Sequence, residues 1–284
     1  MNAFVLSGGA NLGAEQAGML VALLEADIRP DVLVGTSIGA ANAAYLAADP
    51  SLKRARALAD LWRNVRPRDV FPINPVAITR AILRGGALFP TDPFKRLMER
   101  EISYRAIEDA KVPLRIVATA FDDGCEVVFD SGSVLDAVLA STALPGVFAP
   151  HEIDGRLYLD GGLVDQVPLG PAIDAGACTL YVLSVGFPCP PPKNHRSARA
   201  VLMHSVGILL SQQVRFDGDH LPSHHPDLRV IQIPPVCSQV GLRDFSQAAQ
   251  MVERARSQTG RFLSEINKED HAVAASTLTE AVSA

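Results

Sequence analysis

The chain has 284 residues, of which 48% are apolar, so it is long enough to bury a large core within one α/β domain. Its formal net charge is -5, and no block of basic residues interrupts the sequence. These properties exclude a general attraction to polyanions, so we expect no nucleic acid partner. We expect a single domain over 1–272 and a mobile tail over 273–284.

The start of the chain, Met1 to Leu6, lacks the basic residues and long apolar run of a secretory signal peptide. No stretch of about 18 uncharged apolar residues follows it. We therefore expect a soluble, cytoplasmic protein that contacts membranes only peripherally. The four cysteines are widely spaced without a Cys-x-x-Cys pair, which favours reduced thiols over a disulfide framework or zinc site. They are Cys125, Cys178, Cys189 and Cys237.

A short apolar strand at Phe4 to Leu6 leads into a glycine-rich loop, Ser7 to Gly13, and then into a helical pattern. Such a loop exposes backbone N–H groups, which can cradle a dinucleotide phosphate or form the oxyanion hole of an acyl-transfer enzyme. A dinucleotide site needs Gly-x-Gly-x-x-Gly and an acidic residue further on. Although Asp31 lies nearby, the glycine spacing does not fit, so the loop favours the oxyanion hole.

The second strand, which begins at Asp31, runs into Gly35-Thr36-Ser37-Ile38-Gly39 and an alanine-rich helical pattern. Gly-x-Ser-x-Gly between a strand and a helix is typical of a nucleophile elbow, with Gly35 and Gly39 where side chains would collide. The elbow places Ser37 at a helix N-terminus, which favours developing negative charge. An ordinary strand-to-helix turn fits the same pattern. Because parallel strands end at one edge of a sheet, both glycine turns are expected to share a site.

An apolar, mildly basic segment at 71–90 follows a predicted helix at 51–62. Three interpretations fit it: a mobile cover over an acyl-chain pocket, a surface that touches lipid, and a packed helix with solvated arginines. A helix is predicted to start at Thr91-Asp92-Pro93, with its inner face formed by Phe94, Leu97 and Met98. Two strands at 113–121 and 125–129 come next, joined by a turn.

A predicted strand ends at Asp160, directly before Gly161 and Gly162. This is where a catalytic base is expected, although an aspartate before two glycines is also a common turn residue. Further elements are predicted at 134–140, 168–175, 179–185, 199–216, 228–233 and 244–267. The His- and Asp-rich loop at 217–227 has metal-binding residue types, but a polar loop interrupted by prolines favours simple solvation, and we expect no metal or cofactor.

Four blocks occur in the order seen in patatin-like phospholipases, and the chain resembles that family over roughly its first 190 residues. They are the loop from Leu6 to Gly13, Gly35-Thr36-Ser37-Ile38-Gly39, Ala140-Ser141 with Pro145, and Asp160-Gly161-Gly162. The resemblance implies a three-layer α/β/α sandwich around a mainly parallel sheet. It further implies a hydrolase of lipid acyl esters, with Ser37 as nucleophile and Asp160 as base. The oxyanion would be held by the N–H groups of Gly8, Gly9, Ala10 and Ile38.

The sequence departs from the family pattern in the first loop, which usually reads Gly-Gly-Gly-x-Arg/Lys-Gly. Here Ala10 replaces the third glycine and Leu12 replaces the basic residue. Alanine keeps its N–H, but a positive charge is lost. Two functions therefore remain open: a serine acyl hydrolase acting on lipid or other acyl esters, and a weakened or non-catalytic lipid-binding or regulatory protein with the same fold.

Overall fold

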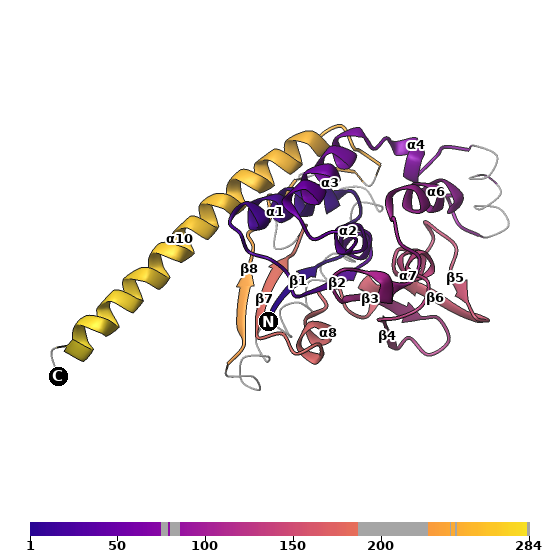
Figure 1. Cartoon of the computed structure of the whole chain (residues 1–284). Coiled ribbons are helices and arrows are strands. Elements are labelled where there is room, and N and C mark those ends of the chain that lie inside the picture. Colours follow the sequence, from indigo (N-terminus) through magenta and orange to yellow (C-terminus); the bar gives the residue numbers. More distant parts are fainter. Residues whose placement is uncertain (75–78, 80–85, 187–226, 239, 242, 283–284) are drawn as a thin grey trace, which may run out of the picture.

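The computed structural model describes residues 1–74, 79, 86–186, 227–238, 240–241 and 243–282, with the backbone alone at 267 and 269–282. Within these residues an eight-stranded sheet lies between helices (Figure 1). The strand order is β5-β6-β3-β2-β1-β7-β8, and β4 pairs with β3 outside this order. The expected α/β class is confirmed.

The parallel part of the sheet places the glycine loop and the serine elbow side by side. Its strands are β1 (Asn2–Leu6), β2 (Val32–Thr36), β3 (Leu114–Ala120), β7 (Thr179–Leu183) and β8 (Arg229–Gln232). Leu6 at the end of β1 pairs with Gly35 near the end of β2. Both chain segments therefore leave the sheet at the same edge, as expected for parallel neighbours.

One side of the sheet is antiparallel, and its register positions the carboxylate. The strands there are β4 (Glu126–Phe129), β5 (His151–Ile153) and β6 (Arg156–Asp160). β6 runs antiparallel to β3, so that Asp160 lies opposite Ala118. On β2, the parallel neighbour of β3, Thr36 pairs with Val117. Along the direction of β3, Asp160 therefore lies about one residue away from Thr36, the residue directly before Ser37.

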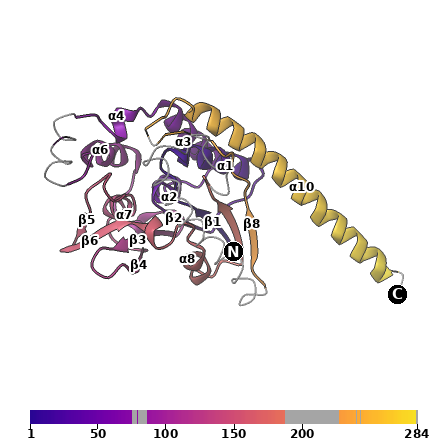
Figure 2. The same ribbon diagram turned by 180° about the vertical axis from the view of Figure 1, so that it is seen from behind.

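The strands alternate between two cores, which explains the layers. On β1, Phe4 and Leu6 face one core, whereas Ala3 and Val5 face the other. The first core is packed by α1 (Gly13–Glu25), α2 (Ile38–Ala47), α3 (Leu52–Asn64) and α10 (Ala248–Val282). The second is packed by α8 (Leu169–Asp174). Figures 1 and 2 show these helices on opposite faces of the sheet, which is the expected three-layer arrangement.

Three further helices lie near the antiparallel side, namely α4 (Pro67–Val70), α6 (Asp92–Glu101) and α7 (Val134–Ser141). α6 begins as predicted, and its inner face is buried at Phe94, Leu97 and Met98. At the other end of the chain, α10 continues beyond the expected end at Asn267 and extends away from the sheet (Figure 1). No helix in the described part of the chain is long and apolar enough to cross a membrane.

Several expectations fall outside the described residues: half of the segment 71–90, the helix 199–216 and nearly all of the loop 217–227. One expectation is corrected. Cys125 and Cys178 are free thiols, but Cys237 is disulfide-bonded. Wide spacing along the sequence does not show which cysteines the fold brings together, so the prediction of four reduced thiols was wrong for Cys237.

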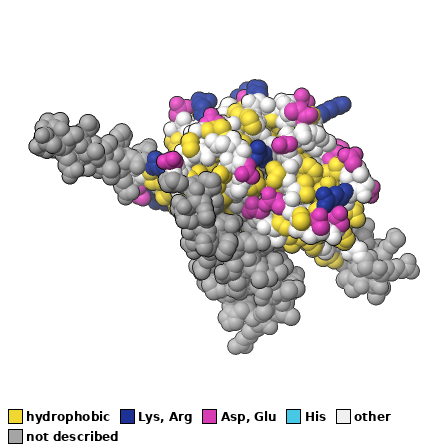
Figure 3. Space-filling view, turned by 90° about the horizontal axis from the view of Figure 1, so that it is seen from below, with side chains coloured by type: hydrophobic (Ala, Val, Ile, Leu, Met, Phe, Trp, Pro, Cys, Tyr) yellow, Lys and Arg dark blue, Asp and Glu magenta, His cyan; other side chains and the backbone are white. Residues whose placement is uncertain are grey.

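The described surface carries mixed charges. In Figure 3, basic side chains lie interspersed with acidic ones over the described part of that face. Ion pairs of this kind include Arg156 with Asp122 and Arg256 with Glu25, at 3.0 and 2.9 Å.

Candidate active site

Ser37 lies in a strained turn between β2 and α2. Its backbone has φ 54° and ψ -125°, which is unusual for a residue with a side chain. The turn is possible because the flanking positions are glycine. A Cβ at Gly39 would collide with the carbonyl of Leu6, and one at Gly35 would approach the amide of Ala40 to 2.6 Å. These are the steric conditions of the predicted elbow.

A buried serine on α7 holds this turn in place. The Ser37 N–H donates to Ser141 Oγ at 2.8 Å, and Ser141 Oγ donates to the carbonyl of Val117 on β3 at 2.6 Å. Ser141 is completely buried. It therefore links the elbow backbone to the neighbouring strand, a role that the sequence pattern did not indicate although Ser141 belongs to one of the quoted blocks.

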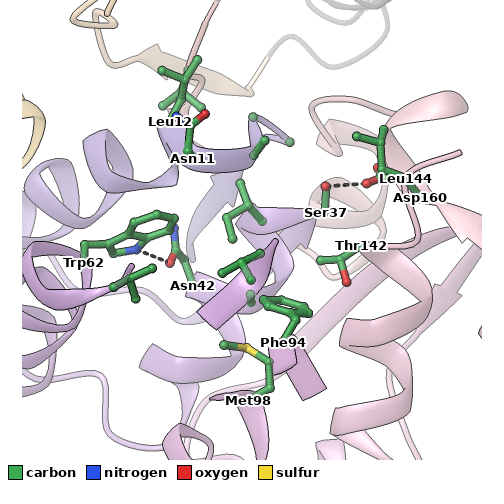
Figure 4. Close-up of a pocket in the computed structure, with 18 of the residues that line it drawn as sticks. Asn11, Leu12, Ser37, Asn42, Trp62, Phe94, Met98, Thr142, Leu144 and Asp160 are labelled. Atoms are coloured by element: carbon green, nitrogen blue, oxygen red, sulfur yellow. Dashed lines mark hydrogen bonds between the residues drawn. The ribbon is translucent and has the colours of Figure 1, made fainter. Parts of the chain in front are cut away.

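The structure brings Ser37 and Asp160 into direct contact. Ser37 Oγ lies 2.6 Å from Asp160 Oδ2 (Figure 4), and Asp160 Oδ1 accepts the N–H of Gly162 at 2.8 Å. Burial raises the pKa of Asp160 to about 6, while the hydrogen bonds from Ser37 and Gly162 act in the opposite direction. A carboxylate that titrates near neutral pH can accept a proton from the serine and return it later.

The described histidine side chain does not take part in this contact. His151 Nε2 lies 3.0 Å from Asp136 Oδ1, between β5 and α7. The other histidines lie outside the described side chains: His195, His204, His220, His224, His225 and His271. Within the described residues, the hydrogen-bond partner of the Ser37 hydroxyl is thus a carboxylate, as the resemblance implied.

The four predicted oxyanion donors differ in their availability. The Gly8 N–H donates to the carbonyl of Gln166 at 3.1 Å, so it is engaged in this conformation. Among the described residues, the N–H groups of Gly9, Ala10 and Ile38 have no acceptor, and all three residues line one cavity with Ser37. Ala10 begins a short 3-10 helix with φ 50°, a conformation that glycine adopts more easily.

Ser37 and Asp160 open onto an apolar cavity of about 370 Å³. Figure 4 shows Phe94 and Met98 on one side of it and the two reactive side chains on the other. Among the described lining residues, Asp160 and Glu101 carry the charged side chains, and no lysine or arginine is present. Much of the wall comes from Leu58, Trp62, Phe94, Leu97, Phe148 and Phe245. Such a cavity suits an uncharged hydrocarbon chain.

A buried polar network joins the glycine loop to the cavity wall, and the sequence analysis missed it. Gln16 donates to the carbonyls of Ser7 and Leu183 at 2.8 and 3.1 Å. Asn42 donates to Gln16 Oε1 at 2.9 Å and accepts from Trp62 Nε1 at 3.0 Å (Figure 4). The available signal was Asn42 in an otherwise apolar helix and Gln16 near the start of a largely apolar one, and single residues of this kind mark no motif.

Leu12, the departure from the family pattern, also lines the cavity, and its side chain lies against Gly186. The described wall therefore has an apolar group where the family usually has a cation. Within the described residues, no three His, Cys, Asp or Glu side chains are grouped so that they could hold a metal ion.

Comparisons with known proteins agree with this geometry. The family model described as Patatin-like phospholipase matches residues 4–173, which contain Ser37 and Asp160. Human patatin-like phospholipase domain-containing protein 6 is 31% identical over 186 residues, or 65% of this chain. An uncharacterized NTE family protein of Mycobacterium tuberculosis is 32% identical over 184 residues, or 64% of this chain.

The chain spans 13% of the length of the human relative and 48% of the mycobacterial one. The crystal structure of VipD from Legionella pneumophila has a similar fold, with a TM-score of 0.51 at 16% sequence identity, covering 93% of this chain and 67% of that chain. The family match covers more than half of the sequence and includes both Ser37 and Asp160. This chain therefore belongs to the patatin-like phospholipase family.

Proposed function

We propose that the protein is a serine acyl hydrolase that cleaves carboxylic esters of lipids through a Ser37–Asp160 dyad. The observation that carries this proposal is the 2.6 Å contact between Ser37 Oγ and Asp160 Oδ2 at the edge of an apolar cavity. The names of the relatives, which include patatin-like phospholipase domain-containing proteins, support the same substrate class. A cytoplasmic location with peripheral membrane contact stays a prediction.

The proposed reaction has two halves. Asp160 accepts the hydroxyl proton while Ser37 Oγ attacks the ester carbonyl, and the free N–H groups of Gly9, Ala10 and Ile38 bind the oxyanion. Collapse of this intermediate releases the alcohol, which takes the proton from Asp160, and leaves an acyl-serine. Water then attacks the acyl-serine with Asp160 again as base, and the products are a fatty acid and free Ser37.

The alternative is a non-catalytic member that binds lipid through the same cavity. Two observations favour it: Leu12 supplies no positive charge, and the Gly8 N–H is already engaged by Gln166. Three donors have no acceptor among the described residues, which is enough for an oxyanion hole, since such sites commonly use two. We therefore prefer the hydrolase.

Labelling with a fluorophosphonate probe, combined with turnover of p-nitrophenyl butyrate, tests the choice. The wild-type protein should label at Ser37 and hydrolyse the ester. Ser37→Ala should lose both properties with an unchanged melting curve, because the nucleophile is gone while the glycines of the elbow remain. Ser264→Ala, which alters an exposed serine on α10, is the matched control and should label fully. A wild-type protein that neither labels nor turns over ester would support the lipid-binding alternative.

A further inference from the structure

Gln166 joins the two loops that carry the proposed chemistry. It follows the Asp160 turn, and its backbone carbonyl accepts the Gly8 N–H at 3.1 Å. Its side-chain Nε2 donates back to the carbonyl of Gly8 at 2.9 Å. Two hydrogen bonds of opposite direction therefore connect one residue of the base loop with one residue of the glycine loop.

The carbonyl of Gly8 has a second donor. Ser7 Oγ accepts the N–H of Val185 at 3.1 Å, which directs its own proton to the Gly8 carbonyl at 3.0 Å. The C=O of Gly8 and the N–H of Gly9 belong to the same planar peptide unit, and in a trans peptide they point in opposite directions. Fixing the carbonyl with two donors therefore fixes the direction of the Gly9 N–H, which has no acceptor among the described residues.

The side-chain amide of Gln166 lies close to where a Cβ would project from a residue of either loop. A Cβ at Gly8 would lie 2.7 Å from Gln166 Oε1, and a Cβ at Gly162 would collide with the same atom. Gly162 is also the residue whose N–H binds Asp160 Oδ1 at 2.8 Å. The amide group of Gln166 thus fills the space between the proposed oxyanion loop and the turn that holds the base.

We infer that Gln166 is a positioning residue, which sets the plane of the Gly8–Gly9 peptide so that the Gly9 N–H faces the oxyanion. The inference rests on the proposed function. In Gln166→Met, a side chain of similar length loses the donor. In Gln166→Glu, an ionised carboxylate cannot donate to a carbonyl, and its negative charge repels the carbonyl oxygen.

A misdirected Gly9 N–H should weaken stabilisation of the transition state and leave substrate binding unchanged. We expect kcat to fall about 10- to 100-fold in both variants with KM nearly unchanged, less than the loss from deleting a whole oxyanion donor. Binding of a trifluoromethyl ketone, which forms an oxyanion with the serine, should weaken by about the same factor as kcat/KM. Binding of the matching methylene ether, which has the chain but no carbonyl, should not change.

The matched control is Gln258→Met. Gln258 makes similar side-chain bonds, to the carbonyls of Pro234 and Pro235 at 3.2 Å, on a helix that does not line the cavity. It should leave kcat and both affinities unchanged. The inference is overturned if the Gln166 variants keep wild-type kcat, or if ketone and ether affinities fall together, which would mean a general distortion of the cavity. Failure of the proposed function itself is distinguishable, because the wild-type protein would then not bind the ketone covalently.

Discussion

Replacing Asp160 by Asn should remove activity and make the protein more stable at neutral pH. The amide has nearly the same shape, its oxygen can accept the Gly162 N–H, and its NH₂ group can donate to Ser37 Oγ, so the fold should persist. The amide of Asn cannot act as a base. We expect turnover to fall by about 10³- to 10⁴-fold, as is typical when the aspartate of a catalytic dyad or triad loses its charge.

The stability gain follows from the pKa of Asp160. Burial raises it from 3.8 to about 6 in the folded protein. Well below pH 3.8 the carboxyl is protonated in both folded and unfolded states, so burial carries no ionisation penalty. As the pH rises from 3.8 to about 6, the unfolded chain loses this proton while the folded state keeps it, so stability falls; above pH 6 the buried group is ionised too and the loss is complete. A difference of about 2 units corresponds to about 3 kcal/mol of lost stability.

Urea unfolding of the wild-type protein and Asp160→Asn between pH 4 and pH 8 measures this effect. The free energy of unfolding of the variant should exceed that of the wild type by about 3 kcal/mol at pH 8, and the excess should fall to about 0.5 kcal/mol at pH 4. Asp244→Asn is a control of opposite sign, because the side-chain and backbone hydrogen bonds from Ser246 lower the pKa of Asp244. A stability difference for Asp160→Asn that does not change with pH would refute the reasoning.

Further expectations concern the same loops. The kcat/KM of the wild type should fall below pH 6, by about tenfold at pH 5, because Asp160 must be deprotonated to accept the proton; an acid limb centred below pH 5, measured by ester turnover, would contradict its role. Ser37→Gly should raise the free energy of unfolding by about 1–3 kcal/mol, since glycine tolerates φ 54° and ψ -125°. Ala10→Gly should raise the free energy of unfolding by about 1 kcal/mol, because glycine also tolerates the φ of 50° at this position. Urea titration of each variant checks both values, and a loss of stability would show that the side chain packs usefully.

The two residues of the proposed dyad could be singled out in the sequence because each one needs a special backbone. A serine in a tight turn requires Gly35 and Gly39, and these glycines are visible as a motif. Asp160 is marked in the same way by Gly161 and Gly162. What the motifs cannot give is the distance between them, since Ser37 and Asp160 are 123 positions apart.

The residues that hold the site together left no comparable mark. Gln166, Gln16 and Asn42 act through side-chain hydrogen bonds to backbone carbonyls, to one another or to Trp62. A lone glutamine or asparagine in a helix or loop has many possible partners, and only the fold selects one. The engagement of the Gly8 N–H was unpredictable for the same reason, because the loop sequence shows which amides exist but not which of them already have acceptors.

The direction of β6 decides whether the two reactive side chains can meet. In a wholly parallel sheet, the strand beside β3 would end at the same edge by topology alone. Here β6 is antiparallel to β3, so its end reaches the elbow only because the pairing stops with Asp160 opposite Ala118, beside the Val117 that pairs with Thr36. A slip of one residue would turn the Asp160 side chain to the other face of the sheet. Thr119 Oγ1, which donates to the Asp160 carbonyl at 2.8 Å, and the Asp160 N–H, which donates to Ala143 at 3.0 Å, hold this register.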